Sequence, residues 1–156
     1  MNGYPISAEA FDLEIYQLYC IFYASRKLHG LSSKHKNLNW LLKTFEQSEL
    51  SKKLISIAVI IRNMKESNNK KDFEKVFVGE IIPDENKPNI KNSLSVREAC
   101  NKLIHAIEID FYPDRDNITD KTPISDKIEL NGQKNNKNWI ANIEVSKFIS
   151  AICSLT

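Results

Sequence analysis

Residues 94–106 read LSVREACNKLIHA, and this segment is the most informative part of the chain. Ser95 and Glu98 have the Ser-x-x-Glu spacing of a capping box, which marks the first turn of a helix. We expect this helix to run to about residue 107 or 109. Apolar residues cover much of its surface, at Val96, Ala99, Cys100, Leu103, Ile104 and Ile107. The pattern therefore predicts a well-buried helix.

Three polar residues recur every four positions in this helix: Arg97, Asn101 and His105. Because positions i, i+4 and i+8 share one face, they should form a polar stripe. An arginine fork can clamp phosphate oxygens, an imidazole can transfer a proton near neutral pH, and an amide can orient a hydroxyl. The same stripe could instead be a polar packing seam that is hydrogen-bonded to neighbouring helices or to a second subunit. The sequence leaves both interpretations open.

Helical periodicity also dominates the sequence before this segment. It predicts three earlier helices, at about residues 7–29, 38–45 and 48–66. Ser7 is the expected N-cap of the first helix, and His29 with Gly30 is its expected end. A β-branched run at 57–61 leaves a strand as the minority interpretation there. Residues 72–82 fit a short helix followed by a strand, and 83–93 form an expected loop.

The pattern changes in the last third of the chain. Residues 111–126 are polar and form an expected linker. Alternating segments at 127–130 and 139–143 flank a stretch rich in turn formers, which predicts a β-hairpin. Ser146 should then begin a last helix. We therefore predict a single, mainly α domain over residues 1–156, with a helical bundle at about 7–110, a linker at about 111–126, and the hairpin and last helix at about 127–156.

Composition restricts the possible classes of protein. The chain has 156 residues, of which 42% are hydrophobic and 27% charged, as in ordinary globular domains. The net charge of +2 is too balanced to identify a nucleic-acid binder by bulk electrostatics. The first residues lack the basic and apolar regions of a signal peptide, and no apolar run is long enough to span a bilayer. We expect a cytoplasmic protein without a membrane partner.

Cysteines and possible metal ligands give no site by themselves. Cys20, Cys100 and Cys153 are odd in number and far apart, so neither a disulfide framework nor a zinc site is expected, and the pattern suits a reducing compartment. His105 and Glu108 have a spacing that can chelate a metal, but no second such pair supports it. We therefore expect no metal and no cofactor.

The segment at 94–106 resembles the signature helix of HEPN domains, in which an arginine, often followed by a polar residue, precedes a histidine by a few positions. Asn101, Lys102 and His105 are similar to the polar and histidine part of that pattern, and Arg97 could supply its arginine. The chain departs from the pattern in two ways. Seven residues separate Arg97 from His105, and Cys100 stands where active members often carry arginine. Arg62 also precedes an asparagine, but no histidine follows it within range.

The resemblance implies a small helical bundle from a prokaryotic defence or toxin–antitoxin system. Many such domains are metal-independent RNases whose site forms across a dimer. His105 would then be the general base or acid, Arg97 the phosphate clamp and Asn101 the orienting amide. RNA would be a partner, contacted also by Lys102, Lys134 and Lys137, and a second copy or another protein would complete the assembly. The alternative is a non-catalytic interaction protein that uses the same stripe as a packing seam.

Overall fold

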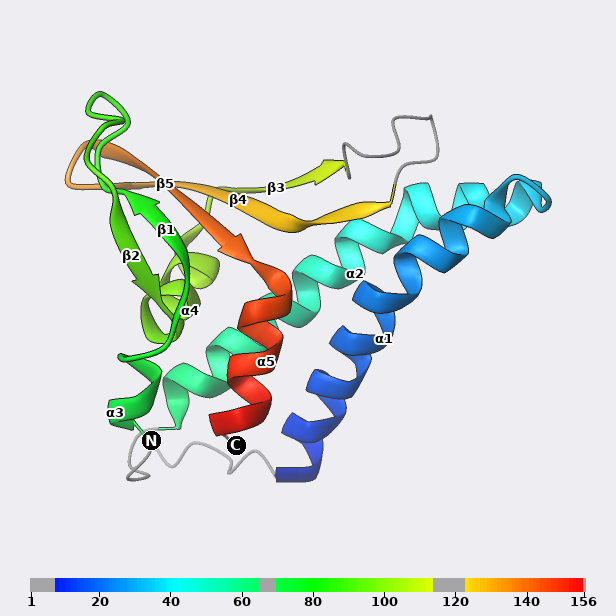
Figure 1. The fold of residues 1–156 in the computed structure, drawn as a ribbon, viewed down its shortest axis with the longest axis horizontal. Helices are drawn as coiled ribbons and strands as arrows, with labels where there is room; N and C mark the ends of the chain where they lie inside the picture. Colours follow the sequence, from blue (N-terminus) through cyan, green and yellow to red (C-terminus); the bar gives the residue numbers. More distant parts are fainter. Residues whose placement is uncertain (1–7, 65–69, 114–122, 156) are drawn as a thin grey trace.

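The computed structural model of the chain shows a mixed α/β fold in which helices cover one face of an antiparallel sheet (Figure 1). It describes residues 8–64, 70–113 and 123–155. The strands are β1 (Phe77–Ile82), β2 (Asn92–Ser95), β3 (Glu108–Pro113), β4 (Ile124–Lys134) and β5 (Lys137–Glu144). They form one five-stranded sheet in the order β2-β1-β5-β4-β3. The expectation of a mainly helical bundle is therefore wrong.

The helices pack below this sheet in the view of Figure 1. They are α1 (Ala8–Ser32), α2 (Lys36–Asn63), α3 (Lys70–Phe73), α4 (Val96–His105) and α5 (Val145–Leu155). α4 and α5 contact the strands directly, α2 packs against α4, and α1 packs mainly against α2. Among the helices within the described ranges, none combines the length and the apolar character that crossing a membrane requires.

The hairpin and the last helix are confirmed, as parts of the larger sheet and its helical layer. β4 and β5 pair in antiparallel register up to Lys134 and Lys137. The two residues between them, Asn135 and Asn136, have φ values of 52° and 60°, as a tight two-residue hairpin turn requires. Alternate side chains point into the core, namely Ile128, Leu130, Trp139, Ala141 and Ile143. One face of the sheet is therefore packed, which explains the alternation in the sequence.

The boundaries of the first helices differ from the prediction. α2 is one continuous helix, so Ser48 lies in its interior and does not begin a new one. Its residues 57–61 are helical, and the alternative of a strand there is wrong. α1 continues past His29 and Gly30 to Ser32. Serine and glycine are permitted inside exposed helix, so they alone do not mark its ends. The predicted N-cap Ser7 lies outside the described residues.

Strand pairing explains the remaining differences between the predicted and the observed element boundaries. The short helix and strand expected within 72–82 are confirmed as α3 and β1. The expected loop ends early, because β2 begins at Asn92 and pairs with β1. α4 ends at His105, and the next residues form β3, which pairs with β4. The expected linker at 111–126 therefore contains strand at both ends, and its middle lies outside the described residues.

Candidate functional site

α4 is held rigidly between α2 and the sheet, and it positions the polar residues of interest. At its start Ser95 accepts a hydrogen bond of 3.2 Å from the backbone N–H of Glu98, so the predicted N-cap is present. Its apolar face is buried at Val96, Ala99, Cys100 and Leu103. The rotation of α4 about its axis is therefore fixed by packing, and its polar face is turned towards a cleft.

The cleft has a volume of about 530 Å³ and opens at the carboxyl end of α4. Three parts of the chain form it: the face of α4 from Glu98 to His105, the last turn of α2 and the end of the β4–β5 hairpin. The lining residues are Arg62, Glu98, Asn101, Lys102, His105, Gln133, Lys134 and Trp139. Side chains that are far apart in the sequence thus converge on one polar hollow, large enough for a phosphate and an adjoining sugar.

His105 and Arg62 meet at the mouth of this cleft. The Nη1 atom of Arg62 lies 3.4 Å from Nε2 of His105. A guanidinium can only donate hydrogen bonds, so this contact is a hydrogen bond in the tautomer that leaves Nε2 without a proton. Both side chains belong to exposed residues, so both are accessible to a ligand.

Trp139 forms the floor of the cleft. It is only 3% exposed, and the Nζ atom of Lys102 lies 4.4 Å from the centre of its ring, in a cation–π contact. Gly132 lies opposite Trp139 in the β4–β5 ladder. A Cβ atom at position 132 would lie 2.1 Å from the indole ring, so only glycine leaves room for it. Trp139 is thus a core anchor, and its covered ring cannot stack on a base while Lys102 is in place.

The charges in the cleft favour an anion. Arg62, Lys102 and Lys134 face a single carboxylate, that of Glu98. Burial lowers the pKa of Lys102 below its ordinary value of 10.5, the charge of Lys134 lowers it further, and Glu98 opposes both effects. Lys102 and Lys134 therefore repel each other. A bound anion would relieve that repulsion.

The structure brings together four of the six residues predicted from the sequence. Asn101, Lys102, His105 and Lys134 line the cleft. Arg97 does not line it, and forms an ion pair with Glu74 instead.

Lys137 also lies outside the lining. Its Nζ atom is 3.7 Å from Oδ2 of Asp84, in the loop after β1. Lys134 and Lys137 are paired across the β4–β5 ladder, but only Lys134 lines the cleft.

The sequence interpretation missed Arg62, Glu98, Gln133 and Trp139 as members of one site. Glu98 had been explained by the capping box. Arg62 carried a usable signal, an arginine followed by asparagine. It was set aside because no histidine follows nearby in the sequence. The contact with His105 spans 43 positions and depends on how α2 packs against α4.

Nothing in the described residues gathers a metal-binding group: no three histidine, cysteine or acidic side chains lie close enough together there. Asp110, one of the acidic residues near His105 in the sequence, instead accepts a hydrogen bond of 3.3 Å from Asn131 on β4. All three cysteines are free thiols. Burial raises the pKa of the Cys100 thiol to about 12, so this residue is no candidate nucleophile.

Comparisons with protein-family models, with curated proteins and with solved structures found no match to this chain. Its function is therefore inferred from the geometry and charge of the cleft.

Proposed function

We propose that the cleft at the carboxyl end of α4 binds single-stranded RNA through a backbone phosphate, and that His105 cleaves the bound strand without a metal ion. The observation that carries this proposal is the contact of Arg62 with His105 beside Lys102 and Lys134. It places a phosphate-binding fork, a proton acceptor and two further cations within one hollow.

Binding and activation are linked in this arrangement. A phosphate is a stronger acceptor for a guanidinium than a neutral imidazole is, because the hydrogen bond is then charge-assisted. A phosphate entering the cleft would therefore draw Arg62 away from His105. Nε2 of the imidazole would be released as a base at the moment the substrate arrives.

The reaction would be an internal transesterification. Nε2 of His105 takes the proton of the 2′-hydroxyl, and the 2′-oxygen forms a bond to the adjacent phosphorus. The bond from phosphorus to the 5′-oxygen breaks, that oxygen takes a proton from water, and the hydroxide left behind takes back the proton that His105 holds. Arg62 and Lys134 neutralise charge on the phosphate, and Asn101 orients the ribose. In this scheme Arg62 has the role that the sequence had assigned to Arg97.

Binding is tested with a fluorescein-labelled oligoribonucleotide and polarisation measurements. We expect Arg62→Ala and Lys134→Ala each to weaken binding about tenfold, as loss of a charged contact of about 1.4 kcal/mol does. The chain offers matched controls, because Arg97→Ala and Lys137→Ala remove the same side chains outside the cleft. The affinity should also fall with salt, with a logarithmic slope of about −2 for three phosphate contacts to a single strand. Equal effects inside and outside the cleft would contradict the assignment.

Cleavage is tested in the presence of a chelator with the same oligoribonucleotide. His105→Ala should abolish the appearance of a 2′,3′-cyclic phosphate product, whereas His35→Ala, at an exposed position in the α1–α2 connection, should not. A 2′-deoxy substrate should bind and remain intact. If the wild-type chain binds the RNA but does not cleave it, the protein binds RNA without being an RNase, and His105 is not catalytic.

A packing role for the same residues is the second candidate. The contacts of Arg62 with His105 and of Lys102 with Trp139 tie α4 to α2 and to β5, which supports it. In that case His105→Ala would lower the free energy of unfolding by about 1–3 kcal/mol and no activity would be lost. In the RNase interpretation stability stays nearly unchanged. The wider expectation, a component of a prokaryotic defence or toxin–antitoxin system, stays a prediction.

A further inference from the structure

α1 exposes an apolar stripe on the side opposite to its core-facing residues. The stripe consists of Leu13, Tyr16, Cys20 and Tyr23, whereas Phe11, Ile15 and Leu18 on the other side are buried. Leu13, Tyr16 and Tyr23 are 52%, 65% and 55% exposed. The spacings of three, four and three residues are those of a coiled-coil seam. A helix that is already packed on one side has no need of this second apolar face for its own fold.

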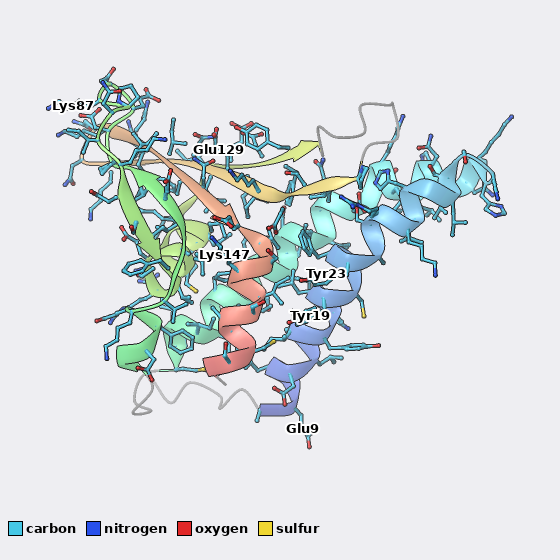
Figure 2. All side chains as sticks on the ribbon, in the orientation of Figure 1. Glu9, Tyr19, Tyr23, Lys87, Glu129 and Lys147 are labelled. Carbon is cyan, nitrogen blue, oxygen red and sulfur yellow. The ribbon has the colours of Figure 1, made fainter. Side chains whose placement is uncertain are left out.

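Charges are separated along the same helix. The acidic residues Glu9, Asp12 and Glu14 all lie in its first half, and the basic residues Arg26, Lys27 and His29 in its second half (Figure 2 labels Glu9, Tyr19 and Tyr23). Glu9 and Lys27 continue the apolar stripe at its two ends, each four residues beyond its last member. The helix dipole favours this polarity of charge, but it does not explain the exposed aromatic residues between the ends.

We propose that α1 is the interface of a homodimer in which two copies of α1 pack antiparallel along this stripe. An antiparallel pair places Glu9 against the partner's Lys27 at both ends of the contact. A parallel pair would place like charges together at each end. The charge pattern is therefore complementary to a second copy of itself in one orientation only.

The same pairing fixes the register. If Glu9 faces the partner's Lys27, then Leu13 faces the partner's Tyr23, and Tyr16 faces the partner's Cys20. The central layers then combine the large Tyr16 with the small Cys20, and the outer layers combine Leu13 with Tyr23. The Tyr16 hydroxyl already lies beside Cys20 within one chain, and the hydrogen bond to this thiol raises the pKa of Tyr16. These two residues form the centre of the proposed contact.

α2 also exposes apolar side chains, at Leu41, Phe45, Ile55 and Val59. The middle of that set is polar, however, because Ser48 and Lys52 lie there. Lys52 forms an exposed ion pair of 2.6 Å with Glu49. A second copy that packed on this face would have to displace the water around both charges, which costs free energy. The stripe on α1 is therefore the better site for a second copy. It lies outside the α4 cleft, so the dimer and the RNA proposal can fail separately.

Sedimentation of the full chain over a range of concentrations tests the association. We expect a dimer for the wild type and a dissociation constant raised at least about tenfold by Glu9→Lys, because two attractive contacts become repulsive. Lys27→Glu should do the same, and the double variant should restore the dimer. Lys127→Glu makes the same change of charge on β4 and should have no effect. A monomeric wild type, or a double variant no better than the single ones, would overturn the proposal.

Disulfide trapping tests the register independently. In a Cys153→Ala background, Tyr16→Cys should form an interchain disulfide with the partner's Cys20 when diamide is added, seen as a dimer on a non-reducing gel. Cys20 alone should cross-link far less, because the two copies of Cys20 do not face each other. Removal of Cys20 by Cys20→Ala in the Tyr16→Cys chain should abolish the band. Efficient cross-linking through Cys20 alone would indicate a different register.

Discussion

The two ends of α4 differ in how their polar side chains are used. At the first turn, the Ser95 hydroxyl caps the helix and Arg97 pairs with Glu74. At the last turn, Lys102 and His105 meet Arg62 from another helix and Lys134 from the hairpin. Ser95 and Arg97 at the first turn each have a partner of their own, whereas three cations, Arg62, Lys102 and Lys134, gather around the cleft at the other end.

This difference shows that a polar stripe on one helix need not be one site. Arg97, Asn101 and His105 share a face of α4, yet only the last two line the cleft. The helix spans about 12 Å between Arg97 and His105, at 1.5 Å per residue. Its neighbours change over that distance. What surrounds each turn, rather than the spacing along the helix, decides the role of each side chain.

The largest expected effect is at the floor of the cleft. Trp139→Ala should lower the free energy of unfolding by about 3–5 kcal/mol, because a large and almost fully buried ring is removed. Trp40→Ala is the matched control, since Trp40 is 61% exposed, and it should cost less than about 1 kcal/mol. Chemical denaturation measures both. Equal losses would contradict the view that the cleft is built on the core.

A smaller effect is expected from the glycine beneath that ring. Gly132→Ala should cost about 1–3 kcal/mol, because the new methyl group would overlap the Trp139 indole and force it to move. Gly30→Ala meets nothing within 4 Å in a helix and should be neutral or stabilising by up to about 1 kcal/mol. Thermal unfolding of the two variants gives the comparison. A tolerated alanine at 132 would show that Trp139 is not confined by the strand.

The two ends of α4 can be separated by a pair of substitutions. Ser95→Ala removes the N-cap and should cost about 1 kcal/mol of stability while leaving RNA affinity unchanged. His105→Ala should change stability by less than about 0.5 kcal/mol, since the residue is exposed, and should abolish cleavage. Unfolding and cleavage are measured on the same preparations. A large loss of stability from His105→Ala with cleavage retained would show that the carboxyl end of α4 has a structural role, and would contradict the distinction between its two ends.

A further effect concerns the buried thiol of α4 and appears only in alkali. Because the pKa of Cys100 is raised to about 12 from an ordinary value of 9.0, the unfolded chain loses this proton at lower pH than the folded chain. Stability from this group should therefore fall as pH rises above 9.0. Unfolding measured against pH should show a shallower decline for Cys100→Ala than for the wild type. Cys20→Ala, which removes an exposed thiol, should leave the slope unchanged.

Local signals in the sequence predicted several elements correctly. The hairpin, the cap at Ser95 and the last helix each depend on neighbouring residues, such as the two asparagines of the turn. The remaining strands depend on distant partners. β2 has four residues, and its pairing with β1 makes it a strand. Such short edges carry too little periodicity to be recognised alone, so the sheet was mistaken for part of a bundle.

The candidate site was predictable only where its residues belong to one locally patterned segment. His105 and Asn101 stand out because their helix is strongly patterned. Arg62 could not be joined to them, since the end of α2 comes close to α4 only when the two helices pack together in the folded chain. Arg97 was overvalued, because its ion pair with Glu74 is a contact between distant segments.

The RNA proposal places the ligand against Asn101, Lys102 and His105 on α4, and away from Arg97. The most direct measurement is an NMR titration of the ¹⁵N-labelled chain with the oligoribonucleotide. We predict that amide shifts change at residues 62, 101–105 and 132–134, and at the indole N–H of Trp139, whereas Arg97 and the α1 stripe stay unchanged. Shifts centred on the first turn of α4 or on another face, or no shifts at all, would contradict the account.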